Sequence, residues 1–165
     1  MNRVVPLVLV LLALARPAAA QTPAPRAAGE PAFTTTGAFI AMSVPDLEAS
    51  VRWYVEKLGM RVVTELPPND GYAVRILEGG GLIAEIMHTP AASPLRTLAP
   101  SVAHTTHVHG IFKAGVVVDD YDVTLATLRA RGVDIAIGPF PARNGQRANF
   151  IVRDNAGNFI QFFGR

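Results

Sequence analysis

The 165-residue chain contains no cysteine, so it has no thiol for a disulfide or a lipid anchor. The absence of cysteine suits an oxidising compartment but does not by itself indicate one. A membrane-spanning helix needs about 20 apolar residues, and the apolar run that starts at Val4 stops sooner, at Arg16-Pro17. The chain also has no lysine and arginine cluster with interleaved aromatics, which argues against nucleic acid as a partner. Gly79-Gly80-Gly81 precedes no helical pattern, which argues against a phosphate-binding loop.

The N-terminus has the layout of a secretory signal peptide. Met1-Asn2-Arg3 supplies a positive start, Val4–Ala15 is apolar, and Ala18-Ala19-Ala20 is a small-residue cleavage site. We expect residues 1–20 to be removed and the protein to be periplasmic or secreted, with no membrane attachment after cleavage. Residues 21–36 are rich in proline and alanine and predict a disordered leader.

Removal of the signal peptide changes the charge balance. Residues 1–20 contain Arg3 and Arg16 and no acidic residue, so the 15 basic residues of the full chain fall to 13, against 13 acidic residues. The expected mature chain is therefore neutral overall. Its length is that of one ordinary domain with a sizeable core.

A strand–helix–strand unit occurs twice in the remaining chain. VPDLEASVRWYVEKLGMRVV starts at Val44, and VDDYDVTLATLRARGVDI starts at Val118. In each copy an aspartate, Asp46 or Asp120, can cap a helix, and a glycine, Gly59 or Gly132, can end it. The apolar positions share helical spacing: Leu47, Val51, Tyr54, Val55 and Leu58 in the first copy, and Tyr121, Leu125 and Leu128 in the second. The repeat indicates a duplicated structural module.

Short β-rich runs separated by turn residues surround each helix. The first copy has Ala38–Val44 before its helix and 61–65, 72–77 and 82–88 after it. The second copy has Ile111–Val118 before its helix and 133–137, 148–153 and 158–163 after it. Pro67-Pro68-Asn69-Asp70-Gly71 and the segment from Gly138-Pro139 to Gly145 are expected to be turns. Each copy is thus predicted to be a β-α-β-β-β module.

The DLxxSxxWYxxxLGM pattern from Asp46 and the RDNAGNFIQF segment from Arg153 resemble the vicinal oxygen chelate superfamily. This superfamily contains glyoxalases, bleomycin-resistance proteins and extradiol dioxygenases. The resemblance covers roughly residues 37–164, and Asn155 stands where the family's Asp-Pro-x-Gly-Asn turn has proline. It implies an α+β fold in which two βαβββ modules, 37–90 and 107–164, form a cupped mixed sheet in a single domain.

The resemblance also implies where a metal would be held. Metal-using relatives take four ligands in all, one from the first strand and one from the last strand of each module. The corresponding residues here are Phe39 and Lys113 on the first strands, and Glu85 and Gln161 on the last strands. Phenylalanine cannot ligate a metal, lysine is protonated, and catalytic zinc sites use about three protein ligands. We therefore expect no metal and no cofactor at this position.

These positions suggest an ion pair in a pocket instead. Lys113 could pair with Glu85 across the cup, and Gln161 could hydrogen-bond to either residue. In a functional version, Lys113 binds an anionic or carbonyl oxygen of a ligand, and Glu85 orients Lys113 or shuttles a proton. In a structural version, the pair only holds the modules together. Phe39 and Gln161 are expected to line this pocket. Strand alternation predicts further wall residues: Ala41, Ser43, Ile83, Met87, Ile111 and Gly115.

Three histidines offer a second metal hypothesis. On an extended chain His107 and His109 would project to one side and could chelate zinc or copper. An unbroken strand would also put His109 on the same face as Lys113. The alternative, which we favour, is that His104, His107 and His109 belong to a polar linker between the modules.

Three classes of function remain open. The first is a metal-independent protein that binds a small molecule between its modules, as in the bleomycin-resistance branch. The second is a glyoxalase-like lyase or isomerase, or a dioxygenase, with a metal held in an altered site. The third is a non-catalytic envelope accessory protein. The missing ligands favour the first class, and a homodimer is possible in each.

Overall fold

The repeat in the sequence is a repeat in the structure. The computed structural model describes residues 26–27, 29–33, 35–69 and 71–165, so the expected signal peptide, residues 1–20, lies outside the described residues. Residues 35–165 form one structural unit. The described residues that precede Ala38 contain no helix and no strand. Within the described ranges, no helix is both long enough and apolar enough to cross a membrane.

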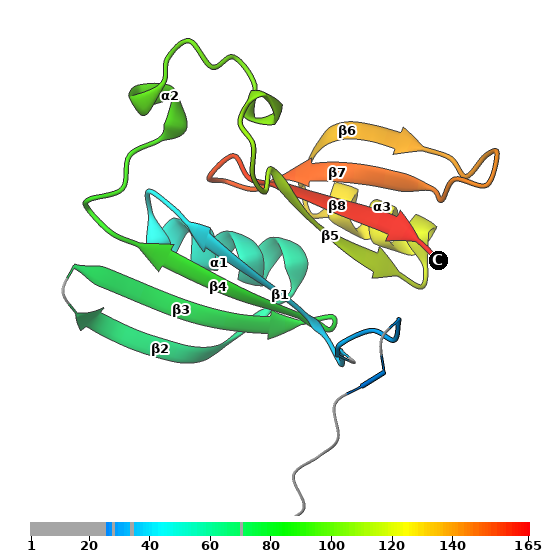
Figure 1. Ribbon diagram of the computed structural model, residues 1–165, viewed down its shortest axis with the longest axis horizontal. Helices are drawn as coiled ribbons and strands as arrows, with labels where there is room; N and C mark the ends of the chain where they lie inside the picture. Colours follow the sequence, from blue (N-terminus) through cyan, green and yellow to red (C-terminus); the bar gives the residue numbers. More distant parts are fainter. Residues whose placement is uncertain (1–25, 28, 34, 70) are drawn as a thin grey trace, which may run out of the picture. The chain divides into compact units, whose positions relative to one another are not determined.

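Each module is a four-stranded mixed sheet with one helix (Figure 1). The first module contains β1 (Ala38–Ser43), α1 (Leu47–Leu58), β2 (Arg61–Asn69), β3 (Tyr72–Gly79) and β4 (Leu82–His88). The second contains β5 (Lys113–Val118), α3 (Tyr121–Ala130), β6 (Asp134–Phe140), β7 (Asn149–Arg153) and β8 (Phe159–Gly164). The strand orders, β1-β4-β3-β2 and β5-β8-β7-β6, are equivalent. This confirms two βαβββ modules, and the linker between them carries α2 (Leu95–Leu98) and the 3-10 helix η1 (Thr105–His107).

Both long helices begin at the predicted aspartates. The Asp46 carboxylate accepts a hydrogen bond from the Ala49 amide at 2.9 Å, and the Asp120 carboxylate accepts one from the Val123 amide at 2.9 Å. Such caps satisfy amides that the first helical turn leaves unpaired. Gly59 ends α1 with φ of 73°, in the left-handed region that favours glycine. The ends of each helix are therefore specified by local sequence.

Two segments expected to be turns belong to strands. Pro67 and Pro68 lie within β2, and Gly138 and Pro139 lie within β6. Both strands are outer edges of their sheets, and the pairing shifts register between Leu66 and Asn69 and between Ile137 and Phe140. An edge strand tolerates proline because one side of its backbone needs no partner. The turn prediction was wrong for these four residues, because sequence alone does not show which strand is an edge. The rest of the second predicted turn follows the end of β6 at Phe140.

The core lies between each helix and its sheet. Tyr54 and Leu77 are fully buried in the first module, as is Phe150 in the second. Phe150 stacks on Phe162 with ring centroids 5.1 Å apart. Side chains alternate along a strand, so the neighbours of these core residues point to the opposite face. That opposite face carries the candidate site.

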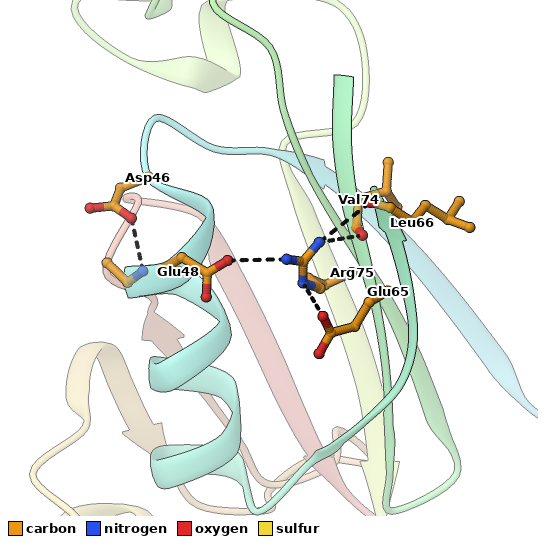
Figure 2. Close-up of polar contacts among 7 residues, drawn as sticks. Asp46, Glu48, Glu65, Leu66, Val74 and Arg75 are labelled. Carbon is orange, nitrogen blue, oxygen red and sulfur yellow. Dashed lines mark hydrogen bonds and ion pairs between the residues drawn. The ribbon is translucent and has the colours of Figure 1, made fainter. Parts of the chain in front are cut away.

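An arginine on the helix side of β3 joins the start of α1 to its sheet (Figure 2). The Arg75 guanidinium lies 3.4 Å from the Glu48 carboxylate in α1 and 3.5 Å from the Glu65 carboxylate in β2. It also donates to the carbonyls of Leu66 and Val74. Only 18% of the Arg75 side chain is exposed, so these partners offset the cost of burying its charge. The network fixes the first turn of α1 over the sheet.

The two modules meet through the residues that carry the family resemblance. The Tyr54 hydroxyl of α1 donates to the Asp154 carboxylate at 3.1 Å, and the Asn155 side-chain amide donates to the Ser50 hydroxyl at 3.1 Å. Asn155 stands at the family's proline position, and here its side chain supplies an intermodule hydrogen bond. At the C-terminal ends of the helices, Lys57 donates to the Arg131 carbonyl and Arg131 donates to the Lys57 carbonyl. These side-chain hydrogen bonds join the two modules.

Candidate functional site

Strand register puts the predicted site residues on the sheet faces opposite the helices. On the parallel pair β1 and β4, Phe39 aligns with Ile83, Ala41 with Glu85, and Ser43 with Met87. On the equivalent pair β5 and β8, Lys113 aligns with Phe159, and Gly115 with Gln161. Aligned residues of paired strands share a face. The register therefore shows that Phe39 is equivalent to Lys113, and Glu85 to Gln161.

The first strands of both modules line one cavity. This cavity has a volume of about 730 Å³ and is bounded by β1, by the start of β5 and by the start of β8. Of the predicted site residues, it brings together Phe39, Ala41, Ser43 and Lys113. Ile111 and Gly115, predicted as wall residues, line it as well. Glu85, Met87 and Gln161 are not among its lining residues.

The structure separates the predicted ion pair. Among the described residues, the Lys113 ammonium has no carboxylate within 4.0 Å, and Glu85 enters none of the ion pairs. Lys113 instead lies against the Phe112 ring, 5.1 Å from its centroid. The predicted Lys113–Glu85 salt bridge is therefore absent. The strand order accounts for this: β1 and β5 are edge strands of their sheets, and Glu85 lies on β4, the next strand in from β1.

The Gln161 side chain hydrogen-bonds within its own sheet. Its side-chain amide donates to the Asn149 side-chain carbonyl on the neighbouring strand β7 at 3.0 Å, and the residue is 7% exposed. A buried amide held in this way stiffens the floor of the second module. It is not positioned to hydrogen-bond to Lys113 or Glu85 as predicted.

The metal position of the superfamily does not fit the residues found here. Phe39 has no donor atom, the Lys113 side chain is cationic, and the Gln161 amide is engaged with Asn149. Within the described part of the chain, no group of three or more histidine, cysteine, aspartate or glutamate side chains is close enough to hold a metal ion. Glu85 is thus the single carboxylate at the equivalent positions. We derive no step through a metal there.

A second cavity lies under the linker between the modules. It has a volume of about 580 Å³, with linker residues 94–96 and 102–106 on one side. Its other side is formed by the second sheet and the turn before β8, through Ile137, Ile151, Arg153, Gly157 and Phe159. Phe112 and Phe159 line both cavities, which makes the two cavities neighbours. From the sequence, this linker was interpreted as a polar connection between the modules, and its place in the wall of the second cavity was not predicted. The apolar side chains of Val102 and Phe112 were the available signal.

The histidine segment is not the extended chain assumed for a second metal site. Thr105–His107 is the 3-10 helix η1, and Gly110 has a φ of 146°. β5 begins only at Lys113, so His109 and Lys113 do not lie on one unbroken strand. The histidine metal site was the less favoured hypothesis, and the structure lacks the unbroken strand that it required. His104 and His107 face each other edge to face, 5.3 Å between ring centroids, and His104 lines the second cavity.

The comparisons with known proteins agree with this architecture. The family model of the Glyoxalase/Bleomycin resistance protein/Dioxygenase superfamily matches residues 38–162, so the chain belongs to that superfamily. None of the curated proteins compared with the chain matches it significantly.

Solved structures with the same fold include enzymes and binding proteins. Glyoxalase I from Zea mays is 17% identical, with a TM-score of 0.57, and the match covers 77% of this chain. This chain spans 43% of the length of that enzyme. TnmS3, an antibiotic binding protein from Streptomyces sp. CB03234, is 19% identical, with a TM-score of 0.55, covering 82% of this chain and 98% of TnmS3. A glyoxylase/bleomycin resistance protein/dioxygenase domain from Frankia sp. EAN1pec is 16% identical, with a TM-score of 0.60 and coverages of 80% and 91%. At these identities the likeness establishes the fold alone.

Proposed function

We propose that this protein binds a small, largely apolar molecule in the cavity between its modules and in the adjoining cavity under the linker, without the metal that the superfamily's enzymes use. The observation that carries the proposal is the exposure of large apolar side chains on the cavity walls. Phe39 is 57% exposed, Phe112 42% and Ile137 43%. Concentrated apolar exposure of this kind marks binding sites on soluble proteins.

The size and composition of the cavities support this reading. Volumes of about 730 and 580 Å³ are in the range that holds a drug-sized ligand. The small residues Ala41, Ser43 and Gly115 leave space beside the aromatic rings. Membership of the superfamily and the fold shared with an antibiotic binding protein are consistent with binding of a small molecule. Glu85 and Lys113, the predicted catalytic pair, are not in contact, which removes the arrangement that would have favoured a proton-shuttling enzyme.

Filling the cavity should remove binding. Ala41 projects into the first cavity from β1, and we expect Ala41→Trp to weaken binding of the uncharged dye Nile red by more than about tenfold, because the indole occupies the ligand's volume. The measurement is a fluorescence titration for saturable, one-site binding. Ala126→Trp, on an exposed position of α3, is the matched control and should bind as the wild type does.

Two outcomes would contradict the proposal. Absence of saturable dye binding to the wild type, or equal loss in both tryptophan variants, would remove the evidence for a binding site between the modules. About one zinc, iron, nickel or manganese ion per chain in untagged protein, lost in Glu85→Gln, would favour the metal-enzyme class instead. A homodimer remains a prediction.

Export is the second part of the proposal. The charged start, the apolar run and Ala18-Ala19-Ala20 support cleavage after residue 20. We expect intact-mass measurement on protein from the periplasmic fraction to show a chain that begins at Gln21. An uncleaved chain in the membrane fraction would contradict export by a cleaved signal.

A further inference from the structure

We infer that the molecule bound between the modules is a planar aromatic anion. This inference rests on the proposed function and specifies the ligand class of the same cavities. It starts from the charged residues on the cavity walls, which are of one sign. Lys113 lines the first cavity, and Arg96 and Arg153 line the second together with His104. No aspartate or glutamate is among the described residues that line either cavity.

Two of these cations lie beside the rings that the cavities share. The Lys113 ammonium is 5.1 Å from the centroid of the Phe112 ring, and the Arg153 guanidinium is 5.4 Å from that of Phe159. Phe112 and Phe159 line both cavities. A flat ring that stacks on either phenylalanine would therefore place its substituents next to a positive charge. The geometry combines offset aromatic packing with a charge-assisted hydrogen bond.

The neighbouring acids leave these cations available. The nearest carboxylate to Arg153 is that of Asp134, 3.8 Å away, and both side chains are at least half exposed. An exposed pair at that distance is weak. Within the described residues Lys113 and Arg96 have no ion-pair partner. Two acids of the first sheet share the face of the first cavity: Glu85 lies on β4, one strand from Ala41, and Glu78 lies on β3 and pairs with Arg61 at 2.9 Å. A carboxylate or sulfonate on the ligand thus meets more attraction than repulsion.

The experiment compares three 2-substituted naphthalenes, one anionic, one uncharged and one cationic, by calorimetric titration of the full mature chain. We expect 2-naphthoate to bind about tenfold more tightly than uncharged 2-naphthamide, the effect of one charge-assisted hydrogen bond. Cationic 2-naphthylmethylamine should bind more weakly than the amide. The preference for the anion should shrink between about 50 and 500 mM salt, because partly exposed charges are screened.

Variants identify the residues responsible. Lys113→Met should reduce the preference for the anion several-fold, and Lys113→Met combined with Arg153→Met should abolish it. Arg147→Met removes an exposed cation that lines neither cavity and should leave the preference unchanged. A preference that survives in the double variant would overturn the assignment.

The outcomes also separate this inference from the proposed function. Equal affinity for naphthoate and naphthamide would refute the charge requirement and leave the proposed function standing. Nile red binding without binding of any naphthalene would refute the planar aromatic class in the same way. Failure of every naphthalene and of Nile red would overturn the proposed function itself.

Discussion

Replacement of Asp154 by alanine is expected to lower the free energy of unfolding by about 3 kcal/mol. Both carboxylate oxygens of this buried residue are used. Oδ1 accepts from the amides of Ala156 and Asn158 at 2.9 and 2.7 Å, and Oδ2 accepts from the side chains of Tyr54 and Asn158 at 3.1 and 2.9 Å. The alanine variant would leave the turn's amides without acceptors and would break the contact between the modules. The cost of such unsatisfied groups exceeds the value of the bonds themselves.

Chemical denaturation of the two proteins measures this difference, which should also appear as a fall in Tm of roughly 10 °C. Asp119→Ala is the matched control, because its carboxylate pairs with Arg165 at 2.7 Å while both side chains are largely exposed. Exposed pairs contribute little, so that variant should unfold as the wild type does. A loss in Asp154→Ala no larger than in Asp119→Ala would show that the turn does not stabilise the module interface.

Most of the fold was predictable because each module's signals are local. Asp46 and Asp120 cap helices whichever tertiary structure follows, and the spacing of Leu47, Tyr54 and Leu58 specifies a buried helical face. The errors fall where tertiary placement overrides a local preference. Val55 belongs to the same apolar pattern, yet it is 39% exposed. Prolines 67 and 68 were assigned to a turn because their place on an edge strand depends on the order of the whole sheet.

The strand positions of the candidate site residues were predictable from the sequence, but the contacts of their side chains were not. Equivalence of Phe39 with Lys113 and of Glu85 with Gln161 follows from the repeat, and the strand register confirms it. The contact between Lys113 and Glu85 did not follow, because it depends on the spacing of two sheets that share no hydrogen-bonded strands. Lys113 lies against the Phe112 ring instead, and Gln161 hydrogen-bonds to Asn149. Neither residue occupies a family ligand position, so the resemblance contained no information about them.

The two faces of the sheets carry different kinds of contact. On the helix side, polar side chains are buried and hydrogen-bonded. Among all the described residues, every buried side-chain nitrogen or oxygen has a hydrogen-bond partner. The opposite side exposes aromatic rings and cations with few partners. Stability and binding therefore depend on different residues. Substitutions at Tyr54, Ser50 or Asp154 should change unfolding, and substitutions at Phe39, Ala41 or Lys113 should change binding with little effect on the fold.

Tyr54 should make the stability of the protein fall steeply above about pH 10. Burial, and then the charge and hydrogen bond of Asp154, raise the pKa of the Tyr54 hydroxyl well above its usual value of 10. Because the folded state favours the protonated phenol, the stabilisation is complete below the unfolded-state pKa near 10. It is lost as the pH rises beyond that value, by about 1.4 kcal/mol for each pH unit up to the folded-state pKa.

Denaturation curves at pH 7 and at about pH 11.5 test this expectation, and the predicted extra loss for the wild type is about 2 kcal/mol. Tyr54→Phe should cost about 1 kcal/mol at pH 7, because one hydrogen bond to Asp154 is lost, and should then lose less stability at high pH than the wild type. Tyr72→Phe removes the same hydroxyl from a half-exposed side chain and should keep the wild-type alkaline loss. The difference between the two variants isolates the contribution of Tyr54. Equal alkaline losses in the wild type and Tyr54→Phe would mean that the hydroxyl bonded to Asp154 is not what couples folding to pH.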